Sequence, residues 1–157
     1  MVIKSAGVLI YRMTPEPQVF LGHMGGPFWE HKDEGAWGIP KGIVEENETL
    51  IEAAVRECQE EMGFKVDPKG LRELGFVKMK NGKEVHAWAY EVAPGTEITI
   101  SSNSFDLEWP KDSGEIRQFP EVDRAEWFTV EIAANKLISA QVEFLQRLNL
   151  LASLVNC

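Results

Sequence analysis

Residues 49–62 restrict the possible folds more than any other part of the sequence, because both ends of this segment carry helix signals. Thr49 and Glu52 match a capping box, in which each side chain bonds to the backbone N–H of the other residue. Gly63 stands where helices commonly end in a left-handed turn. Apolar residues recur at the helical period between these signals: Ile51, Ala54, Val55, Cys58 and Met62. The segment is therefore predicted to be an amphipathic helix that buries these five residues.

Segments with the composition of β-strands flank the predicted helix on both sides: residues 6–12, 18–21, 71–80, 84–92 and 125–128. The first two frame a turn with two prolines, and the third and fourth frame Asn81-Gly82, a strong signal for a two-residue hairpin. Residues 22–38 are rich in glycine and aromatic residues without a regular period, so we expect an ordered loop there. The polar residues 94–120 are expected to contain short strands and a loop.

Two helical patterns follow, over residues 130–138 and 141–151, and Ser139 is the candidate N-cap of the second. A stripe in the second pattern is expected to pack in the core rather than to form a groove for a partner: Val142, Leu145, Leu148 and Leu151. Strands and helices interleave without regular alternation, which favours an α/β fold with a mixed sheet flanked by helices. No repeat or linker divides residues 1–157, so a single domain is expected.

Charge and cysteine content limit the partners and the compartment. The 157 residues carry a formal net charge of −9, which would repel a long polyanion, so no DNA groove is expected. A small phosphorylated ligand is compatible with this charge where a divalent cation reverses the local sign. The two cysteines, Cys58 and Cys157, cannot build a disulfide framework, and neither a signal-peptide pattern nor a membrane-length apolar run occurs. These features predict a cytoplasmic protein with no membrane span.

Glu57, Glu60 and Glu61 are spaced so that their carboxylates share one side of the predicted helix, which we expect to lie opposite the buried side. Like charges at this spacing destabilise a helix by a few tenths of a kcal/mol per pair, and a bound divalent cation would offset that repulsion. Carboxylate oxygens suit Mg²⁺ or Mn²⁺. By itself such a cluster usually marks only a solvated surface, so its function is judged from the residues around it.

Those residues resemble the Nudix box, which reads glycine, five residues, glutamate, seven residues, Arg-Glu, an aliphatic residue, any residue, Glu-Glu, any residue, glycine and an aliphatic residue. The matching positions are Gly42, Glu48, Arg56, Glu57, Cys58, Glu60, Glu61, Gly63 and Phe64. Agreement by chance at the polar and glycine positions is on the order of one in 10⁸ per window. Cys58 and Phe64 depart from the usual aliphatic residues but are apolar, and Asn47, where glycine is frequent, tolerates a left-handed turn.

The resemblance implies an α/β/α sandwich that hydrolyses a pyrophosphate bond in a nucleotide substrate with the help of a divalent cation. It implies that Glu57, Glu60 and Glu61 coordinate Mg²⁺ or Mn²⁺, that Arg56 orients one of these carboxylates, and that Glu48 supports the junction of loop and helix. The resemblance leaves the general base open between Glu60, Glu61 and a residue of a later loop.

The candidate in that loop is Glu121, which precedes Trp127 by a spacing similar to that of a glutamate and a tryptophan in the Nudix diadenosine tetraphosphatases. Lys41 lies in a Pro-Lys-Gly run similar to theirs, so we expect it to contact phosphate. Phe28 and Trp29, in the glycine-rich loop, are the candidates for stacking on a base.

Several substrates remain open at this point. A dinucleoside polyphosphate or a nucleoside triphosphate is expected first, although Ala87 stands where the tetraphosphatases tend to have a tyrosine. The alternatives are the 5′-triphosphate end of RNA and a non-catalytic nucleotide-binding module on the same fold. An isomerase is a further alternative, but such enzymes use a reactive cysteine and Cys58 is expected in the core. The sequence leaves the choice between monomer and homodimer open.

Overall fold

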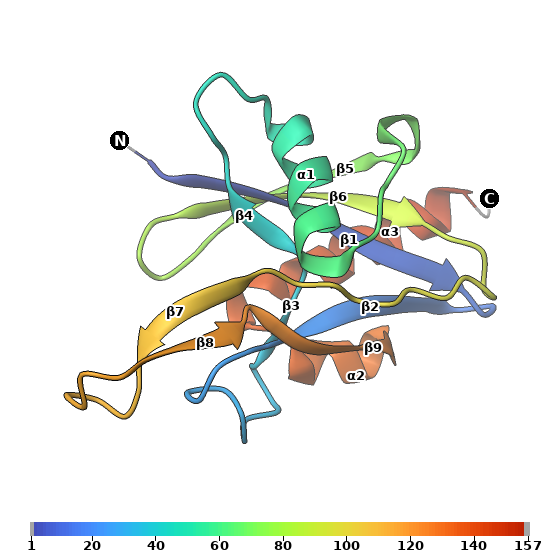
Figure 1. The fold of residues 1–157 in the computed structure, drawn as a ribbon. Coiled ribbons are helices and arrows are strands. Elements are labelled where there is room, and N and C mark those ends of the chain that lie inside the picture. The colour runs from blue at the N-terminus through green and yellow to red at the C-terminus, as the bar shows by residue number, and fades with distance from the viewer. Residues whose placement is uncertain (1, 156–157) are drawn as a thin grey trace.

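The computed structural model describes residues 2–155, which build a sheet with helices on both faces (Figure 1). Seven strands form this sheet: β1 (Lys4–Met13), β2 (Pro17–Met24), β3 (Trp37–Gly38), β4 (Lys41–Ile43), β5 (Arg72–Lys78), β6 (Glu84–Glu91) and β9 (Val122–Thr129). Their order is β3-β2-β1-β6-β5, with β4 also paired to β1 and β9 to β2. Because β1 runs parallel to β6 and antiparallel to β2, the sheet is mixed, as predicted.

Helix α1 (Leu50–Met62) covers one face of the sheet, and α2 (Val130–Lys136) and α3 (Glu143–Val155) cover the other. Alternate residues of β1 therefore enter different cores. Val8 and Ile10 pack with α1, whereas Leu9 and Tyr11 pack with α2 and α3. A strand that is buried on both faces has a continuous apolar sequence instead of an alternating one. The arrangement is the expected α/β/α sandwich.

The strands β1 and β2 pair with each other only near their hairpin, from Ile10↔Phe20 to Met13↔Pro17. Beyond this point residues 37–43 lie between them, because β3 pairs with β2 and β4 pairs with β1. Where the chain crosses from one strand to the other, the Ile39 N–H donates to Gln141 Oε1 at 3.0 Å. This crossing joins the segment before α1 to the connection between α2 and α3.

Both predicted ends of α1 are confirmed. The Glu52 N–H donates to Thr49 Oγ1 at 3.2 Å and the Thr49 N–H donates to Glu52 Oε1 at 3.0 Å. Gly63 ends the helix with a left-handed φ of 65°. Asn47, in the loop before the helix, also takes a left-handed φ, of 67°. Local signals of the sequence thus determine where α1 begins and ends.

The predicted buried face of α1 is wrong in part. Ala54, Cys58 and Met62 are fully buried as expected, but Ala53 joins them, and Ile51 and Val55 are half-exposed. Successive helix residues are 100° apart, so a small rotation of the helix about its axis changes which apolar residues at the edge of the stripe are buried. Packing against the sheet determines this rotation. The real rotation turns the helix so that part of its acidic side faces the sheet.

Several connections also differ from the predictions. The β5–β6 hairpin has a three-residue loop instead of a two-residue turn, because the Gly82 N–H donates to Met79 O at 2.9 Å and Gly82 itself has a φ of 86°. The predicted loop over residues 22–38 is shorter, since its ends belong to β2 and β3. Ser139 begins the 3₁₀ helix η2 (Ser139–Gln141) and does not cap α3, which starts at Glu143.

The short strands expected within residues 94–120 are present as β7 (Ser104–Glu108) and β8 (Ile116–Pro120), which form a separate two-stranded sheet. This hairpin projects from the body of the molecule at the lower left of Figure 1. The predicted core stripe of α3 is confirmed, with Leu145 and Leu148 buried and Val142 and Leu151 packed against them. The 3₁₀ helix η1 (Pro68–Gly70) follows α1. Among the described residues, no helix has the length and apolarity needed to span a membrane.

The capping box of α1 leads to a stability prediction. Thr49→Ala should lower the free energy of unfolding by about 1 kcal/mol, because the Glu52 N–H loses its acceptor at the start of the helix. Urea denaturation followed by circular dichroism measures this change. Thr99→Ala, at an exposed position outside the helices, is the matched control and should change the stability by less than about 0.5 kcal/mol. Equal effects of the two substitutions would contradict the capping role.

Candidate active site

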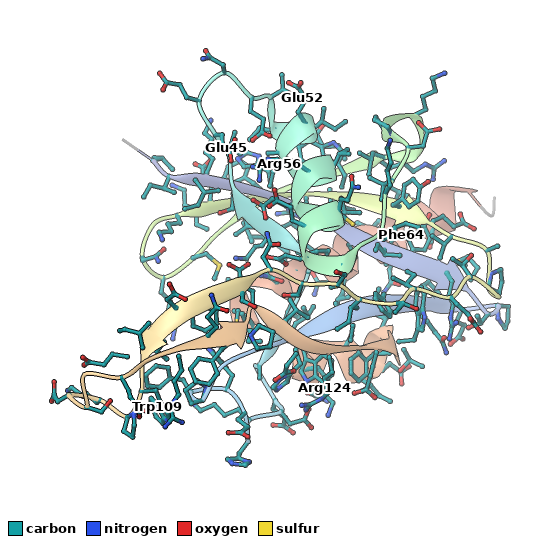
Figure 2. The ribbon with its side chains drawn as sticks, viewed as in Figure 1. Glu45, Glu52, Arg56, Phe64, Trp109 and Arg124 are labelled. Atoms are coloured by element: carbon teal, nitrogen blue, oxygen red, sulfur yellow. The ribbon has the colours of Figure 1, made fainter. Side chains whose placement is uncertain are left out.

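Arg56, in the middle of α1, contacts acidic side chains of the helix and of the preceding loop, which carries Glu45 (Figure 2). Its Nε and Nη2 atoms donate to the two carboxylate oxygens of Glu48, at 2.7 and 2.9 Å. Its Nη1 atom donates to Glu57 at 2.7 Å and to Glu60 at 3.3 Å. One guanidinium therefore orients three carboxylates, and the two bonds to Glu48 have the paired geometry that arginine favours.

Glu48 connects the loop to the helix. Besides its bonds to Arg56, it accepts a hydrogen bond from the Glu45 N–H at 3.0 Å. The bonds from Arg56 and from this backbone N–H lower the pKa of Glu48 to about 2. In return, the bond to Glu48 raises the pKa of Arg56, so the pair remains charged across the physiological range.

Glu57 lies against β4 because residue 42 has no side chain. A Cβ atom at Gly42 would overlap the carboxylate of Glu57. The Glu57 side chain is 12% exposed, and this burial raises its pKa although Arg56 acts in the opposite direction. The glycine at the start of the box thus admits a partly buried carboxylate beside the sheet.

Glu61 is the most enclosed of the acidic residues on α1. Its Oε2 atom accepts a hydrogen bond from the Lys41 N–H at 3.2 Å. Burial raises the pKa of Glu61 to about 8, and the carboxylates of Glu57 and Glu121 act in the same direction. Glu60 points away from the sheet, with its side chain 40% exposed. The expectation that all three glutamates lie opposite the buried face is therefore wrong for Glu57 and Glu61.

A cavity of about 60 Å³ lies beside Glu61 at the crossing of residues 37–43. Residues from five separate parts of the chain line it: Gly22, Met24, Gly38, Ile39, Lys41, Glu61, Glu121, Val122 and Gln141. Glu121 follows β8 and is held by its backbone, since its N–H donates to Asn103 O and its carbonyl accepts from the Gly25 N–H, both at 2.9 Å. The fold thus brings Glu121 next to Glu61 although 60 positions separate them in the sequence.

The chemistry of these residues fits a hard divalent cation. Carboxylate oxygens are the preferred ligands of Mg²⁺ and Mn²⁺. Burial disfavours the ionised forms of Glu57 and Glu61, and a bound cation would stabilise these forms. Within residues 2–155, no group of three or more acidic, histidine or cysteine side chains is arranged so that it could hold a metal ion by itself. Mg²⁺ rarely needs such a group, because waters and substrate phosphates usually supply the remaining ligands.

Two of the three residues predicted to contact the substrate line cavities, and the third does not. The Lys41 side chain lines the small cavity, and Trp29 lines a larger apolar groove of about 730 Å³ that shares Met24 with that cavity. Phe28 instead makes an edge-to-face contact with Trp109 on the β7–β8 hairpin, with ring centroids 5.3 Å apart, and is 60% exposed. The structure therefore brings Lys41 near the acidic residues, places Trp29 in the neighbouring apolar groove and leaves Phe28 outside that groove.

Gln141 is a site residue that sequence reasoning missed. It is fully buried, and its side chain lies against Gly38 in the wall of the small cavity. A lone glutamine at the expected start of a helix carries no signal of such a position. Its position depends on long-range pairing, of β3 with β2 and of β4 with β1, which the sequence does not reveal.

Comparison with known proteins identifies the family of this chain. The family model described as the NUDIX domain matches residues 2–148. The chain belongs to the Nudix family. It is a hydrolase that acts on pyrophosphate bonds, and the predicted box and fold class are confirmed by this match.

The relatives of this Nudix hydrolase include proteins named for dinucleoside polyphosphates. The asymmetrical bis(5′-nucleosyl)-tetraphosphatase of Rattus norvegicus is 31% identical over 121 residues, which cover 69% of this chain and 79% of that protein. The structure of an Ap4A hydrolase binary complex from C. elegans superposes with a TM-score of 0.68 at 19% identity, over 95% of this chain and 98% of that one. The MutT protein of Methanosarcina mazei Go1 superposes with a TM-score of 0.61 at 21% identity, over 94% and 93%. At these identities the two structural likenesses concern the fold.

The burial of Glu61 leads to a prediction for the Nudix hydrolase without divalent cations. Because the pKa of Glu61 rises from 4.5 to about 8 on folding, the stability of the metal-free protein should fall as the pH rises through this range and level off above it. Glu61→Gln removes this charge and should raise the free energy of unfolding at pH 9 by about 2 kcal/mol.

Urea denaturation in EDTA at pH 5 and pH 9 measures the effect. The stabilisation should be absent at low pH, where the carboxyl group is already neutral. Glu46→Gln, in an exposed loop position, changes the net charge equally and should have no such pH-dependent effect. A Glu61→Gln protein whose stability follows the wild type at both pH values would show that Glu61 is not enclosed as described.

Proposed function

We propose that this Nudix hydrolase cleaves a nucleoside polyphosphate in a reaction that needs Mg²⁺ or Mn²⁺, with a dinucleoside polyphosphate such as diadenosine tetraphosphate as the first candidate and a nucleoside triphosphate as the second. One observation carries the proposal. Met24 lines both the acidic cavity beside Glu61 and the apolar groove beside Trp29. An apolar site and a cation site that share a wall residue suit a molecule with a base at one end and phosphates at the other.

The groove has the dimensions and lining of a nucleoside site. Its volume of about 730 Å³ lies within the usual range for small-molecule pockets, about 300–1,000 Å³. Trp29 offers an aromatic ring to a base. Asn81, Asn135 and Ser139 add polar groups around the apolar wall, which can fix the orientation of the base through hydrogen bonds.

The acidic residues are assigned to the phosphates. Glu57, Glu60 and Glu61 are proposed to hold the cation, which neutralises charge on the phosphate oxygens when it is bound. Arg56 keeps Glu57 and Glu60 in position through its hydrogen bonds. Lys41, beside the cavity, supplies a positive charge for a phosphate oxygen. In this proposal the glutamates bind the cation, Arg56 positions two of them, and Lys41 binds a phosphate oxygen.

Glu121 is proposed as the general base. It shares the cavity with Glu61, but none of the hydrogen bonds and ion pairs of the described residues engages its side-chain carboxylate. A base must accept a proton from water, so a carboxylate that no arginine or lysine holds is better suited than Glu60, whose carboxylate bonds to Arg56.

A second groove favours a substrate with two large ends. It has a volume of about 670 Å³ and lies on the outer side of α1, where its lining includes Val55, Arg56, Glu60, Ser101 and Asn103. Because Arg56 and Glu60 line this groove, it borders the acidic residues of α1 and is proposed to hold the second nucleoside of a dinucleoside polyphosphate. The names of the rat and nematode relatives agree with this order of candidates.

The remaining alternatives are less well supported. The net charge of −9 disfavours a long RNA substrate. Burial raises the pKa of Cys58 to about 12, so this thiol cannot provide the reactive thiolate that an isomerase of this fold would need. The cysteine content supports our further proposal of a cytoplasmic site of action, and we propose that residues 1–157 act as one catalytic domain.

Product analysis tests the proposal. Diadenosine polyphosphates, nucleoside triphosphates and nucleotide sugars are incubated with the protein and Mg²⁺, and the products are separated. A monophosphate and a triphosphate from diadenosine tetraphosphate are expected, with activity abolished by EDTA. Glu121→Gln should lower kcat about 100-fold or more by removing the base, whereas Glu46→Gln should behave as the wild type. A wild-type protein that binds these nucleotides without cleaving any of them would favour the binding-module alternative.

The nucleoside end of the substrate has its own test. Binding of a nucleotide should quench tryptophan fluorescence through contact of the base with Trp29, and Trp29→Ala should remove most of this quenching and raise KM. Phe28→Ala is the comparison, because Phe28 packs on Trp109 outside the groove. Quenching that survives in Trp29→Ala would place the base elsewhere.

A further inference from the structure

Gln141 contains a buried polar group without a partner in the protein. Its side chain is 0% exposed, and its Nε2 atom is the one buried side-chain nitrogen or oxygen that lacks a hydrogen bond within residues 2–155. A buried donor left in this condition destabilises the folded protein. This destabilisation indicates that another acceptor meets this NH₂ group when the protein works.

The orientation of the Gln141 amide follows from its other contact. Its Oε1 atom accepts the Ile39 N–H at 3.0 Å, at the crossing where neither β1 nor β2 can pair with Ile39. Rotating the amide by 180° would point the NH₂ group at this N–H, so that two donors would face each other. The free group is therefore a donor, and it belongs to the wall of the small cavity that contains Glu61 and Glu121.

The size of the cavity limits what the NH₂ group can meet. A volume of about 60 Å³ is far below that of pockets for bases or sugars, and it is enough for a few water molecules. A phosphate oxygen without a hydrogen could accept from Gln141, but it could not donate to Glu61 or Glu121. A water molecule can accept from Gln141 and donate to both carboxylates, so it satisfies all three groups.

We propose that Gln141 positions the water molecule that attacks the substrate, an inference that rests on the function proposed above. The Gln141 NH₂ group donates to one lone pair of the water oxygen, and Glu121 accepts a proton from it. The other lone pair forms the bond to phosphorus. The proton passes to Glu121, and the bond between that phosphorus and the bridging oxygen breaks, with the electron pair leaving on the bridging oxygen. Gln141 itself is not consumed.

Gly38 takes part in the same arrangement. A Cβ atom at position 38 would lie 3.2 Å from Oε1 and 3.5 Å from Nε2 of Gln141, so a side chain there would press on the amide. The glycine leaves the amide close to the backbone crossing and directed into the cavity.

Gln141→Glu separates positioning of the water from a structural role. The glutamate keeps an oxygen that can accept the Ile39 N–H, but it replaces the NH₂ donor with an acceptor. We expect kcat to fall about 100-fold with KM changed less than threefold, because the bound nucleotide does not touch this residue. Gln146→Glu, at an exposed position of α3, makes the same change of charge and should retain wild-type kinetics.

A crystal structure of the wild-type protein with Mg²⁺ supplies a readout that does not depend on turnover. It should show a water molecule within hydrogen-bond distance of Gln141 Nε2 and of a carboxylate of Glu61 or Glu121. In Gln141→Glu this water should be lost or displaced, while thermal unfolding verifies that the variant is folded.

The outcomes separate this inference from the proposed function. An active wild type with an equally active Gln141→Glu variant, or with no water at Nε2, overturns the role of Gln141 and leaves the proposed function intact. A wild type that cleaves no nucleoside polyphosphate overturns both. If the variant does not fold, the wild-type crystal structure alone decides, because a cavity without that water contradicts the proposal.

Discussion

The backbone of residues 37–43, inserted between β1 and β2, is the constraint on which the rest of the site depends. Two strands that separate leave N–H and C=O groups that must find new partners, and β3 and β4 provide them. The insertion holds Lys41 and Gly42 against α1 and draws Gln141 in from the opposite face of the sheet. Residues from both layers of helices therefore meet where β1 and β2 separate.

The acidic side chains beside this insertion lower the stability of the metal-free protein. Glu57 and Glu61 are partly buried, and burial raises the pKa of each, so the metal-free protein holds carboxylates in a place that disfavours their ionised form. Arg56 compensates for part of this cost on one side of the helix only. The unpaired donor of Gln141 is a further cost of the same kind. Such local conflicts with folding are typical of sites that are completed by a ligand.

The sequence predicted those features that depend on neighbouring residues. The ends of α1 follow from Thr49, Glu52 and Gly63, each within a few positions of the group that it binds. The rotation of α1 could not be predicted in the same way, because Ala53 and Val55 are both apolar and contact with the sheet decides which of them is buried. The place of Gln141 depends on a contact with Ile39 across 102 positions, for which a single sequence holds no signal.

The β7–β8 hairpin pairs within itself and is fastened at its base, where Glu121 bonds to Asn103 and Gly25. Its tip, with Trp109, touches the loop of Phe28 without joining the main sheet. Insertions or replacements at the tip would leave the clamp at its base undisturbed. The tip can therefore change in length or sequence during evolution while the backbone bonds at the base keep Glu121 in its place.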